Sequence, residues 1–222
     1  WRTDIGNGIR AIGTENTELP TVTLSIKIPG GHLLETNRLE KAGIASFFAD
    51  MMNEETKNYS AEQMSRELQK LGSSVNVSSS LDGITFSVQA LKKNLDPTLK
   101  LLEEKMFRPN FKEETFARIK KQTIEGFKIA KTQPATVASA VFAKVNYGDK
   151  HILGVAEDGD EETVKNFTLA DVQHYYDNYM TSQGVNVVVV GDIKENEIIP
   201  KLAFLKNLPN KKIDIPAVPE AK

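Results

Sequence analysis

Alternating apolar and polar residues mark several short segments of the chain. The alternation over residues 9–16 and 22–28 predicts two strands, joined by a turn at Leu19-Pro20. Further strands follow in the same way, with Asp82-Gly83 as the turn signal of a hairpin. They are predicted at 73–80, 83–91 and 185–192.

Helical periodicity and capping signals fill the stretches between these strands. A helix is predicted from about Leu39 to Met52, and Ser60 with Gln63 forms a capping box for a second helix, which Gly72 ends. The remaining helices are predicted to begin at Asp96-Pro97, at Asn110 with Glu113, after Pro134 (through Val137, Val141 and Val145 to Tyr147-Gly148), at Thr168 with Asp171, and after the last strand. This order predicts an α+β fold: a single two-layer domain with a mostly antiparallel sheet and helices packed on it.

The ends of the chain suggest a place within something longer. Residues 1–208 are expected to form the one domain, and residues 209–222 form a proline-spaced tail typical of a linker to a following domain. The sequence opens on Trp1 rather than Met, so we expect a piece of a longer polypeptide.

Composition narrows the possible functions. With 40% hydrophobic residues and a formal charge of −2, the chain has material for a sizeable core and no basic field for a nucleic-acid partner. A locally basic run predicts only a solvated helix face, made by Arg118, Lys120, Lys121, Lys128 and Lys131. No apolar run approaches the ~20 residues of a membrane span. The chain has 0 cysteines, which excludes disulfides, thiolate metal sites and a cysteine nucleophile.

The stretch GIASFFADMM at 43–52 has two distinct faces when placed on a helix. At about 100° per residue, one arc is apolar and predicted to face the core: Ile44, Phe47, Phe48, Met51 and Met52. The opposite arc carries Ser46, Ala49 and Asp50, with Ala42 and Asn53 beside them. That face is small and weakly polar, so it either lines a cleft or lets another helix approach closely.

The surroundings of this stretch resemble a known family. The spacing of Gly30-Gly31, Glu35 and Gly43 before an apolar helix is similar to the first part of a pitrilysin/insulinase-type zinc metallopeptidase domain, where an inverted H-x-x-E-H motif lies on the helix. The resemblance continues in order through LQKLGSSVNVSSSLDGITFSVQAL, FRPNF, YGDKHILG and FTLADVQHYYDNYMTSQGVNVVVVGDI. It implies the fold of the metallopeptidase and mitochondrial processing peptidase-like domains.

Carried over by position, the resemblance places Ser46 at the first histidine, Ala49 at the glutamate and Asp50 at the second histidine. The chemistry needs two imidazoles one helical turn apart on one ion, and a carboxylate that takes a proton from zinc-bound water. Alanine accepts no proton, and a serine hydroxyl is a poor zinc ligand. We therefore expect no catalytic residue, metal ligand or cofactor site in this chain.

The family's remaining ligand is a glutamate on the long helix, about eight residues before a proline. Counting back from Pro134 places Gly126 there, with Glu125 one residue away. One residue turns a helical side chain by about 100°, so Glu125 is expected to point elsewhere. By this assignment, none of the four positions of the family's metal site keeps the residue that the chemistry needs.

The resemblance implies a non-catalytic domain of a zinc metallopeptidase, forming part of a peptide chamber. Zinc would be in a catalytic domain elsewhere in the polypeptide or in a partner subunit, so the implied partners are such domains and a peptide substrate. A bacterial periplasmic location is favoured by resemblance alone. Two alternatives stay open: a scaffold of the same fold without protease activity, or an active peptidase with an unusual site using Asp50, Glu125 or a histidine.

The histidines have ordinary interpretations. His32 follows a Gly-Gly turn and is expected to bond locally, His151 matches a position where the family often has a structural histidine, and His174 lies on a helix beside two tyrosines. Tyr147 is predicted to be a packed aromatic at a helix end. A zinc site made from all the histidines would need distant segments to converge.

Overall fold

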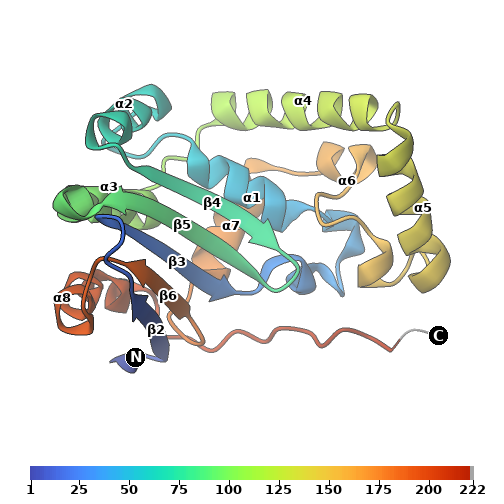
Figure 1. Cartoon of the computed structure of the whole chain (residues 1–222). Coiled ribbons are helices and arrows are strands. Elements are labelled where there is room, and N and C mark those ends of the chain that lie inside the picture. Colours follow the sequence, from blue (N-terminus) through green and yellow to red (C-terminus); the bar gives the residue numbers. More distant parts are fainter. Residues whose placement is uncertain (221–222) are drawn as a thin grey trace.

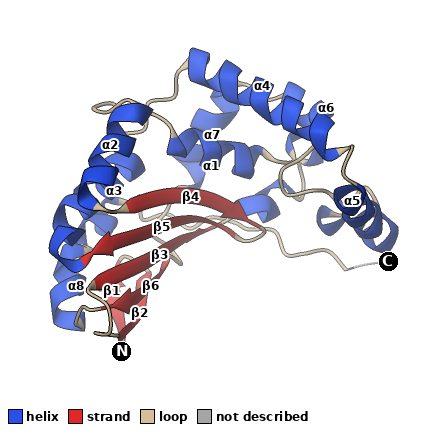
Figure 2. Ribbon diagram, turned by 45° about the horizontal axis from the view of Figure 1, so that its top comes forward, coloured by secondary structure: helices blue, strands red, loops and turns tan. Residues whose placement is uncertain are grey.

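Alternation along the strands gives the sheet one buried and one open face. A computed structural model describes residues 1–220 and has a six-stranded sheet in the order β1-β2-β6-β3-β5-β4 (Figure 1, Figure 2). In β3, Val22 and Leu24 are fully buried, whereas Thr23 between them is exposed. The strands are β1 (Arg2–Gly6), β2 (Ile9–Glu15), β3 (Thr21–Pro29), β4 (Ser74–Ser80), β5 (Gly83–Leu91) and β6 (Asn186–Gly191). Every neighbouring pair is antiparallel except β2 and β6, which confirms the predicted α+β class and mostly antiparallel sheet.

The first two predicted strands are not neighbours in this sheet. β6 lies between β2 and β3, and the connection through Leu19-Pro20 crosses its end. Asn16 N donates to Gly191 O at 2.9 Å and Asp192 N donates to Thr21 O at 2.9 Å, so both sides of the crossing are held. The valine-rich β6 is a central strand, and its insertion is a long-range event that local alternation does not predict. β1 was also missed, because its sequence RTDIG is short and largely polar.

The capping boxes predicted at Ser60 and Thr168 and the helix end predicted at Gly72 are confirmed. Ser60 and Gln63 exchange both capping-box hydrogen bonds, Thr168 and Asp171 do the same, and Gly72 ends its helix with φ 60°. The helices are α1 (Ile44–Asn53), α2 (Ala61–Leu71), α3 (Leu95–Phe107), α4 (Glu113–Ala130), α5 (Pro134–Tyr147), α6 (Glu161–Lys165), α7 (Leu169–Tyr179) and α8 (Glu195–Lys201).

Three predicted helix starts were wrong by a few residues. The run from Leu39 is a short 3-10 helix, and α1 begins only after Gly43, whose φ of 93° breaks the helix. α3 begins at Leu95, ahead of Asp96-Pro97. Asn110 does not cap α4, because the helix begins at Glu113 with Lys112 at the N-cap position, and Asn110 N donates to Glu55 O at 3.1 Å in an extended segment.

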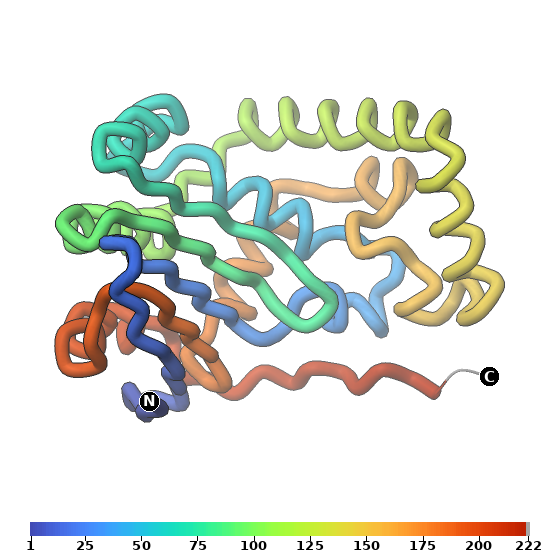
Figure 3. The backbone as a smooth tube through the Cα atoms, in the orientation of Figure 1, coloured from blue at the N-terminus to red at the C-terminus, as the bar shows by residue number. Residues whose placement is uncertain are grey.

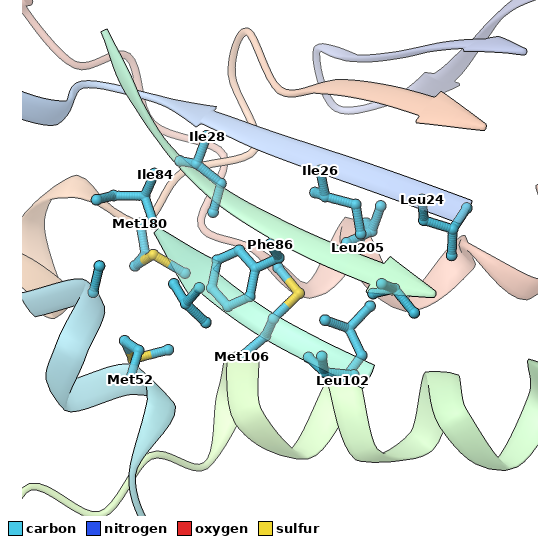
Figure 4. Close-up of a cluster of buried hydrophobic side chains, with 14 of the residues drawn as sticks. Leu24, Ile26, Ile28, Met52, Ile84, Phe86, Leu102, Met106, Met180 and Leu205 are labelled. Carbon is cyan, nitrogen blue, oxygen red and sulfur yellow. The ribbon is translucent and has the colours of Figure 1, made fainter. Parts of the chain in front are cut away.

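The core fills the layer between the sheet and the helices (Figure 4). Side chains from β3 and β5 meet methionines and leucines from α1, α3 and the C-terminal part of the chain: Leu24, Ile26, Ile28, Ile84, Phe86, Met52, Leu102, Met106, Met180 and Leu205. Full burial of each such side chain is worth about 1.5–3 kcal/mol. This layer holds α1 rigidly beside the sheet.

Two parts stand apart from the core. α5 forms an arm at the edge of the molecule, beyond the end of α4 (Figure 1, Figure 3). The segment from 209 to 220 runs in extended form along the body, bonded at its start through Ser182 N to Pro209 O and near its end through His151 to Pro219 O. Residues 221–222 of the predicted linker lie outside the described part of the chain. Among the described residues, none of the helices is long and apolar enough to cross a membrane.

Candidate functional site

The apolar face of α1 packs as its pattern predicts. Ile44, Phe47, Phe48, Met51 and Met52 are all buried. The Phe48 ring stacks on the ring of Tyr175 from α7, with centroids 4.5 Å apart. Tyr175 of the stretch HYYDNYM therefore packs against α1.

A buried carboxylate holds the N-terminus of α1. Glu35 Oε2 accepts from Gly43 N at 2.8 Å, and Glu35 Oε1 accepts from Ala45 N at 2.9 Å. A helix N-terminus leaves N–H groups without partners and carries partial positive charge, so a carboxylate there is doubly favourable. Glu35 thus replaces the ordinary N-cap side chain, which Gly43 lacks.

His32 joins this carboxylate to a distant loop. Its Nδ1 lies 2.6 Å from Glu35 Oε2, and its Nε2 lies 3.3 Å from both Ile152 O and Val155 O. Both carbonyls only accept, so Nε2 carries a proton. Burial alone lowers the pKa of His32, but the hydrogen bond and charge of Glu35, together with the carbonyls, raise it overall. The expected local bonding of His32 is confirmed.

A buried ammonium holds the other end of α1. Lys105 Nζ donates to Met52 O at 3.3 Å and to Asn53 O at 2.8 Å, where the helix leaves carbonyls without partners. Burial lowers the pKa of Lys105 to about 8, against a smaller opposing effect of Glu54. The carboxylate of Glu35 therefore lies at the N-terminus of α1 and the amine of Lys105 at its C-terminus, the arrangement that the helix dipole favours.

The motif positions lie on the opposite face of α1. Ser46 Oγ donates to Asp158 Oδ1 at 2.7 Å, and Ala49 is buried. Asp50 has an exposed side chain, yet desolvation by its surroundings and the charges of Asp158 and Glu54 raise its pKa to about 6. This face brings carboxylates together without a cation among the groups that shift the pKa of Asp50.

The loop that carries Asp158 approaches this face closely. A Cβ on Gly43 would lie 2.4 Å from Asp158 O, and a Cβ on Gly159 would lie 2.2 Å from Ala42 O. The small residues at 42 and 43 thus serve close packing, but against a loop and not against the helix that was predicted.

The positions that the resemblance assigns to the remaining ligand lie on the exposed part of α4. Gly126 is exposed, and a Cβ there would meet nothing within 4 Å. Glu125 is exposed and lies 4.0 Å from Lys121 one turn away.

The remaining histidines take part in separate local contacts. His151 accepts from Leu153 N through Nδ1, lies 2.9 Å from Pro219 O through Nε2, and stacks on Tyr147. His174 is exposed and contacts the Asn178 amide of its own helix. Within residues 1–220, no group of three or more His, Cys, Asp or Glu side chains is placed to hold a metal ion.

The donor set on α1 does not fit a catalytic zinc. Such sites use three protein ligands, typically imidazoles or thiolates with a carboxylate. On α1 itself this face offers one carboxylate, Asp50, and one hydroxyl, Ser46, and that hydroxyl is bonded to the neighbouring carboxylate of Asp158.

The roles of Glu35, Lys105 and Asp158 were missed by sequence reasoning. Glu35 was noted only for its spacing, and nothing in the local pattern connects Lys105 or Asp158 to α1. A charged residue in an apolar helix face, as Lys105 is in LLEEKMF, is the one signal that could have suggested a buried partner.

The sequence and the fold are both similar to those of known proteins. Residues 11–151 match the family model described as Insulinase (Peptidase family M16). The chain belongs to peptidase family M16. It is 26% identical over 192 residues to "Uncharacterized zinc protease YmxG" of Bacillus subtilis, covering 86% of this chain and 46% of that protein. It is 24% identical over 195 residues to "Non-peptidase homolog YmxG" of Helicobacter pylori, covering 87% and 44%. The chain spans about half the length of these M16 relatives.

Solved M16 structures share the fold. A peptidase M16 inactive domain from Pseudomonas fluorescens superposes with a TM-score of 0.89 at 23% identity, covering 100% of this chain and 53% of that one. The periplasmic protease PqqL from Escherichia coli superposes with a TM-score of 0.84 at 21% identity, covering 100% and 25%. The resemblance to the family and the expected fold are both confirmed.

Proposed function

We propose that this chain is a non-catalytic M16 domain that forms part of the wall of a peptide chamber and supports a catalytic, zinc-binding domain elsewhere in the same polypeptide or in a partner subunit. The observation that carries the proposal is the contrast between the two faces of α1. Its core face is fully packed, whereas its motif positions are Ser46, Ala49 and Asp50, with the Ser46 hydroxyl bonded to Asp158. Glu125 and Gly126 lie exposed on α4 and supply no ligand to that face in this proposal.

The arm formed by α5 supports a larger assembly. No residue of α5, all of which the structure describes, is buried, although its surface carries Val137, Val141, Phe142 and Val145. The exposed fraction reaches 79% at Val145. Apolar surface of this kind marks protein contacts. We propose that this stripe, the α5 stripe, packs against another M16 domain, with residues 1–208 as the domain and 209–222 as the linker.

The relatives support this role in part. One relative of similar match is named a non-peptidase homolog, and another is named a zinc protease. The name of the non-peptidase homolog favours the alternative of a scaffold without any proteolytic partner. For location, the description of PqqL as periplasmic favours the bacterial periplasm.

Peptide cleavage tests the proposal. The purified chain with added zinc is expected to cleave no member of a mixed quenched-fluorescent peptide set, whereas the longer protein, or its partner complex, cleaves if it contains an intact H-x-x-E-H. Zinc-dependent cleavage by the isolated chain that Asp50→Ala abolishes would contradict the proposal. An assembly without an intact motif or cleavage would favour the scaffold.

The α5 stripe has its own test in the same assembly. Val145→Asp is expected to weaken association with the neighbouring domain while leaving the unfolding free energy of the isolated chain within about 0.5 kcal/mol of wild type, because Val145 is exposed. Lys70→Asp, at an exposed position of α2, is the control. Unchanged association of the Val145 variant would exclude the stripe as the contact.

A further inference from the structure

The outer edge of the sheet runs along β4, and one side chain occupies its centre. β4 is the last strand in the sheet order and pairs with β5 on one side. Such an edge presents backbone N–H and C=O groups to which an extended chain can add. At Val77 both groups are taken by Asn53: its Oδ1 accepts from Val77 N at 2.9 Å, and its Nδ2 donates to Val77 O at 2.7 Å.

The pairing places Val77 on the outward side of β4. In an antiparallel ladder, alternate residues bond to the neighbouring strand and the others turn their backbone groups away from it. Since Val77 bonds to Asn53, the residues at either side of it, Asn76 and Ser78, are those that bond to β5. Val75 and Ser79 share the outward direction of Val77. An added strand would therefore use Val75, Val77 and Ser79, with Val77 at the centre.

Asn53 is held firmly in this position. Its Nδ2 also donates to Ala49 O at 3.1 Å, one turn back in α1, and its own carbonyl accepts from buried Lys105 at 2.8 Å. The side chain is half-buried. Its carboxamide, with one donor and one acceptor turned to the strand, has the hydrogen-bonding groups of a peptide unit.

We propose that Asn53 closes the β4 edge to extended peptides by occupying the two backbone hydrogen bonds that a docking strand needs at Val77. A peptide could add across the strand only after displacing the Asn53 carboxamide. This inference goes beyond the proposed function and does not depend on it, because the edge is closed whether or not the chain lines a chamber. If it does line one, peptide contacts would have to involve side-chain surfaces instead of this edge.

Amide hydrogen exchange tests whether the Asn53 carboxamide protects Val77, without relying on a ligand. In the wild-type chain the Val77 amide is expected to exchange about as slowly as those of Asn76 and Ser78. In Asn53→Ala it is expected to exchange at least about tenfold faster, the effect of losing one hydrogen bond. Asn146→Ala is the matched control, since Asn146 makes the same bond to the carbonyl one turn back, at 2.7 Å to Phe142 O, away from any strand. An unprotected Val77 in the wild type, or unchanged exchange in Asn53→Ala, would overturn the proposal.

Peptide binding tests the consequence. The probe is a fluorescein-labelled peptide of alternating valine and threonine with terminal lysines, and its control has alternate backbone amides N-methylated. Asn53→Ala is expected to bind the probe about tenfold more tightly than wild type, and the methylated peptide is expected to gain nothing. Equal binding by wild type and variant, or an equal gain for the methylated peptide, would overturn the proposal. If Asn53→Ala does not fold, Asn53→Asp keeps the size and the acceptor for Val77 N and removes only the donor to Val77 O, so a smaller gain in the same direction is expected, and no gain would overturn the proposal.

Discussion

Two helices with apolar residues, α1 and α5, differ in what covers them. α1 is buried along its core face and held at its ends by Glu35 and Lys105, whereas α5 begins at Pro134 and packs only at the periphery. Both were predicted as helices from local pattern. The difference teaches that the local pattern predicts a helix and its apolar face. Contacts with distant parts of the chain decide whether that face is buried in this chain or left free for another molecule.

Matched phenylalanine truncations give the largest test of this comparison. Phe48→Ala on α1 is expected to lower the unfolding free energy by about 4 kcal/mol, because Phe48 is fully buried and stacked on Tyr175. Phe142→Ala on α5 is expected to change it by less than about 0.5 kcal/mol. Urea denaturation measures both. Equal losses at the two positions would remove the distinction between a packed helix and an exposed arm.

The contacts of Glu35 with His32 and the N-terminus of α1 give a smaller, pH-dependent effect on stability. Glu35→Gln is expected to cost about 3 kcal/mol at pH 6, because it breaks a buried pair with His32. The pKa of His32 is raised in the folded protein, so the charged pair contributes fully below the ordinary value of 6.5 and loses its contribution as the pH rises through the folded value.

The measurement is the unfolding free energy of wild type and variant from pH 5 to 9. The difference should be largest at the acid end and shrink towards the alkaline end, leaving the part due to helix capping. Glu62→Gln, an exposed residue paired with Arg66 on α2, is the control and should change little. A difference that does not vary with pH would show that the pair is not ionic.

The motif face gives the smallest effect, and its sign is opposite. The pKa of Asp50 is raised from 3.8 to about 6, so the folded protein binds this proton more tightly, and ionising the carboxyl costs stability. Asp50→Asn is expected to match wild type below about pH 4 and to be slightly more stable above pH 6, by less than about 1 kcal/mol because the side chain is exposed. Thermal unfolding across this range measures the difference. Loss of stability in the variant at pH 7 would contradict this account of the acidic face.

The sequence carries the local parts of the fold and not the distant ones. The capping boxes at Ser60 and Thr168 span one helical turn, so both ends of each interaction could be read together. The insertion of β6 between β2 and β3 joins residues far apart in the chain, and so does the bond from Ser46 to Asp158. The motif positions on α1 were assigned by resemblance to the family and stay a prediction, whereas the contacts that Ser46 and Asp50 make could be described only from the structure.

Zinc content tests the central claim most directly. The purified chain and its Asp50→Ala variant are incubated with excess zinc, desalted and analysed for metal by elemental analysis. The account predicts no retained zinc in either protein, because Ser46, Ala49 and Asp50 do not make a zinc-binding set. One zinc per chain in the wild type, lost in the Asp50→Ala variant, would contradict the account and point to a metal site rebuilt on α1.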